Sequence, residues 1–193
     1  MTRSTYYTAT TLDGYIADEH DSLAWLFEQK TEEGGPAGYD GFIAGIGAMV
    51  MGATTYRWIG DHMRTTDEKW MYDIPCWVFS HREHEPLGEG IRFVSGEVRD
   101  QHAAIWESAG ERDVWVVGGG DLAGQFADLG LLDQIVLSIA PVTLGAGRPL
   151  FPRQHDLRLV ELGRNGDFAV ATYDVVGPRG VSTGSTDVRA EPA

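Results

Sequence analysis

Three consecutive glycines, Gly118, Gly119 and Gly120, follow an apolar segment that ends at Val117 and precede residues typical of a helix start. A glycine lets a phosphate group approach the main chain. A helix N-terminus offers unpaired N–H groups and the positive end of the helix dipole. The pattern therefore predicts a site for the phosphates of a nucleotide, although a tight strand–helix turn with no ligand explains the spacing equally well.

Two known nucleotide-binding motifs do not fit this turn. Residues 118–123 match G-x-G-x-x-A, but that motif needs an acidic residue at the end of the next strand to bind the ribose. The next predicted strand ends in the apolar segment 139–141. A P-loop needs G-K-[ST], and neither Lys30 nor Lys69 follows a glycine. The residues thus disfavour a doubly wound dehydrogenase and exclude a P-loop.

Two carboxylates near the first predicted helix are candidates for proton transfer. Asp13 and Asp21 stand on either side of a short segment that precedes this helix. A carboxyl group whose pKa is raised by burial can donate a proton to a substrate. Turn formation by Asp13 and helix capping by Asp21 are alternatives that are at least as good for each residue alone.

Metal binding is not expected. His81 and His84 stand three residues apart in a polar turn, but no third ligand stands at a characteristic spacing. The single cysteine, Cys76, excludes an intrachain disulfide and a cysteine-based zinc site. Because Cys76 stands in an apolar segment with the composition of a strand, we expect a buried, inert thiol.

The composition is that of a folded, soluble protein. The chain has 193 residues, of which 42% are hydrophobic and 23% are charged. No apolar run approaches the roughly 18 residues of a membrane helix, and the N-terminus lacks the features of a signal peptide. We therefore expect a cytoplasmic protein without a membrane partner. The net charge of −14 and the absence of a basic patch predict no nucleic-acid partner.

Hydrophobic patterning predicts alternating strands and helices and hence an α/β fold with a mixed sheet. The last two strands should form an antiparallel pair. Asp21 or Ser22 should cap the first helix, and Thr54 or Thr55 the third. The domain should span residues 1–177, and residues 178–193 should form a disordered tail. The expected strands cover 4–11, 48–51, 76–80, 91–94, 113–117, 134–140, 157–162 and 168–176, and helices are expected near 23–27, 38–46, after 55, at 98–109 and up to 129.

Four segments, in this order, resemble motifs of the dihydrofolate reductase-like superfamily. Within it they are most similar to the small reductases that resemble the C-terminal domain of RibD, a reductase of riboflavin biosynthesis. The resemblance implies a mostly parallel central sheet with helices on both faces, a C-terminal antiparallel hairpin and a homodimer. The segments are Thr11–Ala17 (family pattern S-L-D-G-x-I-A), Val50–Tyr56 (M-G-R-x-T-Y), Val116–Gly120, and Ala140–Phe151 (P-x-x-L-G-x-G-x-P-L-F).

The resemblance also implies that NADPH lies across the carboxyl ends of the strands. Many relatives carry arginines that pair with phosphate where this chain has Ala53 and Asp121, so NADH stays open as an alternative cofactor. Arg82, or Arg57, can substitute for them. The implied contacts are Ala9 and Ile16 for the nicotinamide, Gly52, Thr54 and Thr55 for phosphate, Ser80, His81 and Arg82 for the adenosine end, and Val117, Gly118, Gly119, Gly120, Asp121 and Leu122 for the pyrophosphate.

The implied activity is hydride transfer to a C=N or C=O bond of a pyrimidine- or pterin-like molecule, as in a 5-amino-6-(5-phosphoribosylamino)uracil reductase. Asp21 or a water would give the proton, and Asp13, Tyr15 and Trp25 would contact the substrate. Ser22 stands where dihydrofolate reductases carry a carboxylate, which argues against dihydrofolate. The alternative is a non-catalytic dinucleotide-binding dimer that acts as a sensor or binds a partner.

Overall fold

The structure, a computed structural model, describes residues 2–180. The predicted disordered tail therefore lies outside the described residues from position 181 onward. Within the described residues, no helix is long and apolar enough to span a membrane.

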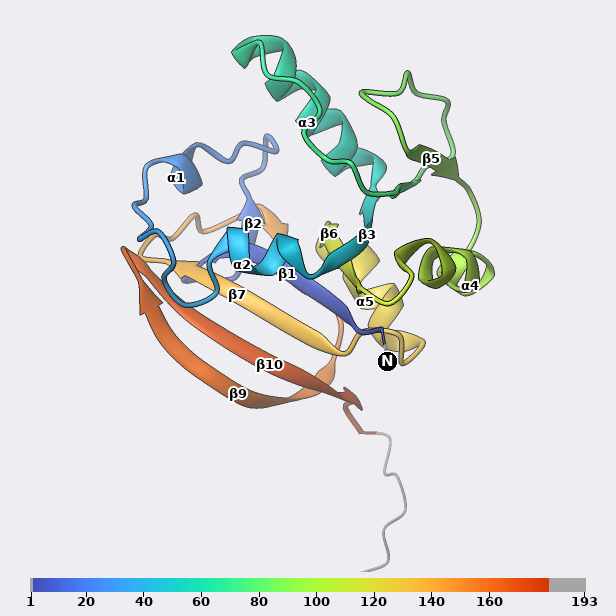
Figure 1. The fold of residues 1–193 in the computed structure, drawn as a ribbon. Coiled ribbons are helices and arrows are strands. Elements are labelled where there is room, and N and C mark those ends of the chain that lie inside the picture. The colour runs from blue at the N-terminus through green and yellow to red at the C-terminus, as the bar shows by residue number, and fades with distance from the viewer. Residues whose placement is uncertain (1, 181–193) are drawn as a thin grey trace, which may run out of the picture.

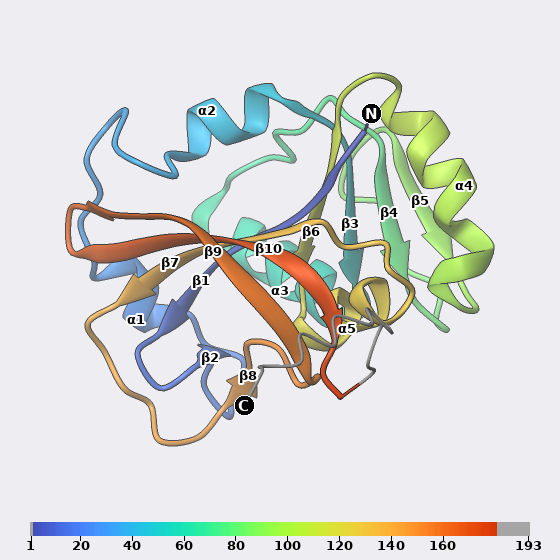
Figure 2. The ribbon, with the colours of Figure 1, turned by 90° about the horizontal axis from the view of Figure 1, so that it is seen from below.

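An eight-stranded sheet forms the centre of the molecule, in the order β5-β4-β3-β6-β1-β7-β10-β9 (Figures 1 and 2). The strands from β5 to β7 are paired in parallel, and β10 pairs antiparallel with both β7 and β9. The strands are β1 (Ser4–Thr11), β3 (Ile46–Gly52), β4 (Cys76–Phe79), β5 (Ile91–Val94), β6 (Asp113–Gly118), β7 (Gln134–Ala140), β9 (His155–Asn165) and β10 (Phe168–Pro178).

Helices cover both faces of this sheet, because alternate residues of its inner strands are apolar on both sides. In β3, Ala48 and Val50 pack in one core with α4 and α5, whereas Met49 and Met51 pack in a second core with α2 and α3. This arrangement confirms the predicted fold class. The helices are α1 (Ala24–Phe27), α2 (Tyr39–Ala44), α3 (Ala53–Thr66), α4 (Val98–Ala109) and α5 (Gly120–Asp128).

The predicted helix caps are wrong. The N-cap of α1 is Leu23 rather than Asp21 or Ser22, although Ser22 Oγ accepts a hydrogen bond from the Ala24 amide at 3.2 Å. The N-cap of α3 is Gly52, and no side chain that the structure describes caps this helix. Because β3 ends at Gly52 itself, α3 begins at the next residue and no separate capping position remains between strand and helix.

A second, two-stranded sheet joins distant parts of the chain and was not predicted. Strand β2 (Tyr15–Ala17) pairs antiparallel with β8 (Arg148–Pro149). Both segments are too short to show a periodic pattern. Gly147 lies so close to β2 that an added Cβ would stand 2.1 Å from Ala17 O. This contact brings the glycine-rich loop 143–147 against the segment that follows β1.

Candidate active site

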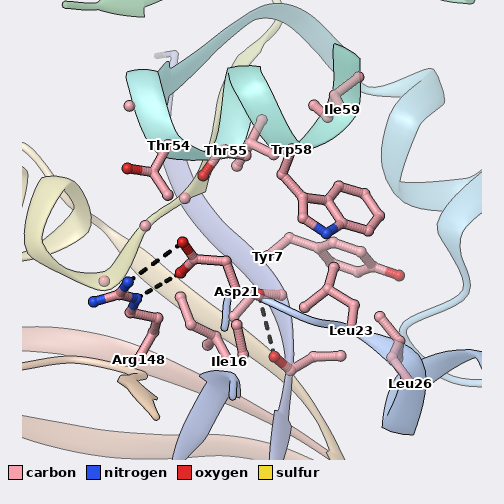
Figure 3. A pocket seen from close by; sticks show the side chains of 18 of the residues that line it. Tyr7, Ile16, Asp21, Leu23, Leu26, Thr54, Thr55, Trp58, Ile59 and Arg148 are labelled. Atoms are coloured by element: carbon pink, nitrogen blue, oxygen red, sulfur yellow. Dashed lines mark hydrogen bonds and ion pairs between the residues drawn. The ribbon is translucent and has the colours of Figure 1, made fainter. Parts of the chain in front are cut away.

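A cavity of about 540 Å³ lies at the carboxyl ends of four parallel strands, β1, β3, β6 and β7 (Figure 3). Ligands of open α/β sheets bind at this edge. Eleven of the residues that the sequence singled out line the cavity, although they come from five separate parts of the chain. They are Ala9, Ile16, Asp21, Gly52, Thr54, Thr55, Val117, Gly118, Gly119, Gly120 and Asp121.

Two of the three consecutive glycines at the junction of β6 and α5 have different roles. An added Cβ at Gly120 would lie 2.2 Å from Leu150 O, so this glycine is needed for close packing against the segment after β8. An added Cβ at Gly119 would meet only Ile16 Cδ1, at 3.8 Å, and Gly119 faces the cavity. The Gly118–Gly119 peptide bond is cis. The strand–helix turn that needs no ligand therefore explains Gly120, whereas Gly119 leaves main chain bare at the cavity.

The turn from β3 into α3 lies beside this glycine turn, because Met51 pairs with Gly118 in the sheet. The 14-residue helix α3 starts at Ala53, directly at the cavity. The hydroxyls of Thr54 and Thr55 make no hydrogen bond to any other residue that the structure describes, and both residues line the cavity. Two helix N-termini thus meet at one place, where their dipoles favour an anion.

A smaller cavity of about 260 Å³ continues from the glycine turn and shares Gly119 and Asp121 with the first. Ser80 and His81, which were predicted at the adenosine end, line it, and so does Leu122, which was predicted at the pyrophosphate. Arg82 does not line it, and its main-chain N–H donates to Ser80 Oγ at 3.0 Å.

Asp121 is hydrogen-bonded to an arginine that the sequence analysis did not single out. Arg153 Nη2 donates to Asp121 Oδ1 at 2.7 Å, and Arg153 Nε donates to Asp128 at 3.1 Å. The guanidinium therefore offsets the negative charge that Asp121 places in the first turn of α5, beside the predicted phosphate site.

An ion pair joins Asp21 to Arg148, and Figure 3 shows both side chains at the end of the cavity near Thr54. Arg148 Nε and Nη2 donate to the two carboxylate oxygens, at 2.5 and 3.3 Å. The carboxylate beside it raises the pKa of Arg148. Arg148 had no predicted role, although it stands in one of the family-like segments, because only the β2–β8 pairing brings it to Asp21.

The other end of the cavity is aromatic and apolar, with Tyr7 and Trp58 as its largest side chains (Figure 3). Tyr7 stacks on Phe42 with ring centroids 4.1 Å apart, and its hydroxyl donates to Ala37 O at 2.8 Å. Trp58 stacks on His62 at 5.0 Å. Burial, and to a smaller extent the charge of Asp40, raises the pKa of Tyr7. The stacking contacts and the hydrogen bond of Tyr7 hold the rings of Tyr7 and Trp58 in place on the cavity wall.

The three predicted substrate contacts lie elsewhere. Trp25 is 6% exposed and packs with Phe168 and Val170 in a small core, so the tryptophan of the cavity wall is Trp58 instead. Asp13 accepts hydrogen bonds from the amides of Leu144 and Gly145, which lowers its pKa, as does the Thr11 hydroxyl. Tyr15 lies in β2, and neither it nor Asp13 lines the cavity. Asp13 thus holds the loop that contains Leu144 and Gly145, and Trp25 belongs to a core.

Residues 4–167 match the RibD C-terminal domain family, and the chain belongs to this family. A curated relative is the uncharacterized protein YwjB of Bacillus subtilis (strain 168). It is 30% identical over 150 residues, which are 77% of this chain and 82% of YwjB. The chain thus carries a RibD C-terminal reductase-like domain.

Two solved structures resemble the fold. A putative riboflavin biosynthesis protein from Shewanella sp. PV-4 has a TM-score of 0.75 and 25% identity, covering 90% of this chain and 99% of that one. Dihydrofolate reductase from Enterococcus faecalis, solved as a complex with NADP(H), has a TM-score of 0.58 and 12% identity. That match covers 90% of this chain and 96% of the other. The second likeness concerns the fold alone.

Proposed function

We propose that this protein is a reductase that transfers hydride from NADPH to a C=N or C=O bond of a pyrimidine- or pterin-like heterocycle. One observation carries the proposal. The N-termini of α3 and α5 meet at a cavity whose opposite end is built of aromatic side chains. The first feature suits the diphosphate of a dinucleotide, and the second suits a planar ring.

The residues present fit a nicotinamide dinucleotide. The bare main chain at Gly119 and the hydroxyls of Thr54 and Thr55 would bind the diphosphate. Ala9 and Ile16 are small or apolar and would lie against the nicotinamide. When bound, the cofactor supplies the hydride, from C4 of its nicotinamide ring.

The protein itself would contribute position more than acid–base chemistry. Stacking the substrate between the nicotinamide and the wall formed by Tyr7 and Trp58 would fix the distance and angle of hydride transfer. Asp21 stays a predicted proton donor. Since both its oxygens already accept hydrogen bonds from Arg148, water is the proton source that we favour.

Oxidation of NADPH in the presence of candidate acceptors tests this proposal. We expect the absorbance of the reduced nicotinamide to fall with at least one aminopyrimidine or dihydropterin acceptor, and NADH to be used less well. Tight NADPH binding without oxidation by any acceptor would favour the non-catalytic alternative, for which the commitment of Asp21 to Arg148 is the supporting observation.

A homodimer is also proposed. Strand β9 is an edge strand of the sheet, and it exposes several large apolar side chains that a second copy can cover. Sedimentation equilibrium should give twice the chain mass, and Leu159→Glu with Leu162→Glu should give a folded monomer. A wild-type monomer at high micromolar concentration would refute the dimer. The exposed side chains are Leu157, Leu159, Val160 and Leu162, with Val176 on β10.

A further inference from the structure

A third cavity, of about 500 Å³, extends the aromatic end of the site away from the glycine turns. It shares the lining residues Tyr7, Thr31, Ser138 and Phe168 with the main cavity, so the two cavities adjoin. The loop from α1 to α2 and the start of α2 form its outer wall. A substituent on a heterocycle that is stacked beside Tyr7 would point into this third cavity.

The charges along this space are almost all negative. Glu32, Glu33 and Asp40 line the third cavity, and no lysine, arginine or histidine among residues 2–180 does. Within the part of the chain that the structure describes, Arg148 is the single basic residue that lines the main cavity, and its guanidinium is already paired with Asp21. Asp40 also acts on the aromatic wall, since its charge is one of the causes that raise the pKa of Tyr7.

Two glycine amides of the loop are already engaged within the loop itself. Gly35 and Gly38 lie in the same loop, but their N–H groups already donate, to Glu32 O at 3.1 Å and to Gly35 O at 3.0 Å. Helix α2 has only six residues and carries Asp40 in its first turn. A phosphate placed here would face the carboxylates of Glu32, Glu33 and Asp40, and none of the described residues that line this cavity offers it a guanidinium.

We propose that the substrate of this protein carries no phosphate and is a neutral or cationic heterocycle whose amino groups face the acidic loop at residues 32–40. This inference rests on the proposed reductase function, and it separates the chain from enzymes that reduce phosphoribosyl substrates. Ring N–H and exocyclic amino groups donate hydrogen bonds that carboxylates accept, and stacking on Tyr7 and Trp58 needs no charge.

A matched pair of ligands tests the proposal. 7,8-Dihydroneopterin and its monophosphate share one ring system and differ in a single phosphate. Titration calorimetry of both, with and without NADP⁺, should show the unphosphorylated compound binding at least about tenfold more tightly at low ionic strength. The ratio should shrink in high salt, because salt screens the carboxylates.

Charge reversal in the loop sharpens the test. The variant Glu32→Lys with Glu33→Lys should reduce or invert the ratio of the affinities for 7,8-dihydroneopterin and its monophosphate. Glu107→Lys with Glu111→Lys changes the net charge by the same amount, on exposed residues at the end of α4, across the molecule from α1 in Figure 1. This control should leave the ratio unchanged.

Three results would overturn the inference: equal or tighter binding of the phosphate, an unchanged ratio in the loop variant, or no heat with either compound at millimolar concentration. Failure of the proposed function is a separate outcome. Absence of NADPH binding would refute the reductase, while the ratio measured without cofactor would still decide the charge preference of the cavity.

Discussion

Different kinds of chemical group form the two ends of the cavity. At the proposed cofactor end, main-chain groups dominate: glycines, two helix N-termini and a carboxylate, Asp121, that is offset by Arg153. At the substrate end, side chains dominate, with the rings of Tyr7 and Trp58 and the carboxylates of the loop 32–40. The first end suits a polyanion and the second disfavours one. The chain's overall charge of −14 therefore says little about its ligands, because the local groups differ so strongly.

The largest effect should come from Gly120→Ala at the cofactor end. The added Cβ would stand 2.2 Å from Leu150 O, so α5 or the segment after β8 must move, and we expect the free energy of unfolding to fall by about 3 kcal/mol. Gly119→Ala is the matched control: it should fold normally but weaken NADPH binding about tenfold. Urea unfolding and calorimetry measure both. Equal stability of the two variants would contradict the conclusion that close packing needs a glycine at position 120 but not at position 119.

Removal of an aromatic ring should affect the substrate end alone. Trp58→Ala should raise KM about 10- to 30-fold, since a stacked ring of this size contributes about 2 kcal/mol, and should leave the Kd for NADPH unchanged. Trp25→Phe should lower stability without changing KM, because Trp25 lies in a core. A larger effect on KM at Trp25 than at Trp58 would support the sequence-based prediction that Trp25 contacts the substrate.

Asp21→Asn separates the two possible proton sources. If water gives the proton, kcat should fall less than about tenfold, because only the orientation by Arg148 is weakened. A loss of about a hundredfold or more would assign proton transfer to Asp21.

Arg153→Met should weaken NADPH binding about three- to fivefold at low salt, because Asp121 would then face the diphosphate without its partner. Arg158→Met is the control, since Arg158 pairs with Asp174, which lies outside the cavity. Isothermal calorimetry at two salt concentrations measures the effect. An equal loss in both variants would show that general charge, rather than the local pair, is responsible.

The smallest effect concerns the loop that leads to Arg148. Hydrogen bonds from Thr11 and from the amides of Gly145 and Leu144 hold the pKa of Asp13 below its usual value. Its stabilising contribution is present above the unfolded pKa of about 4 and is lost as pH falls through the lower folded value. The urea midpoints of wild type and Asp13→Asn should therefore differ at neutral pH and converge in acid. A difference between the two urea midpoints that grows as the pH falls would contradict the lowered pKa of Asp13.

The central sheet and its helices were predictable from sequence because long apolar runs such as 113–117 and 134–140 have few alternative structures. The glycine turn was predictable because its three glycines are consecutive in the sequence. The pairing of β2 with β8, and with it the contact of Arg148 with Asp21, depends on residues far apart in the chain. The choice between Trp25 and Trp58 depends on which ring the folded helices leave at a cavity, and this is a matter of tertiary packing.

Calorimetric titration of the wild-type protein with NADPH tests the central claim most directly. If the main chain near Gly119 and Gly52 binds a dinucleotide diphosphate, binding should be micromolar, about −8 kcal/mol, and NADPH should raise the melting temperature. NADH should bind at the same site, more weakly. Absence of both heat and thermal protection at millimolar nucleotide would contradict the account.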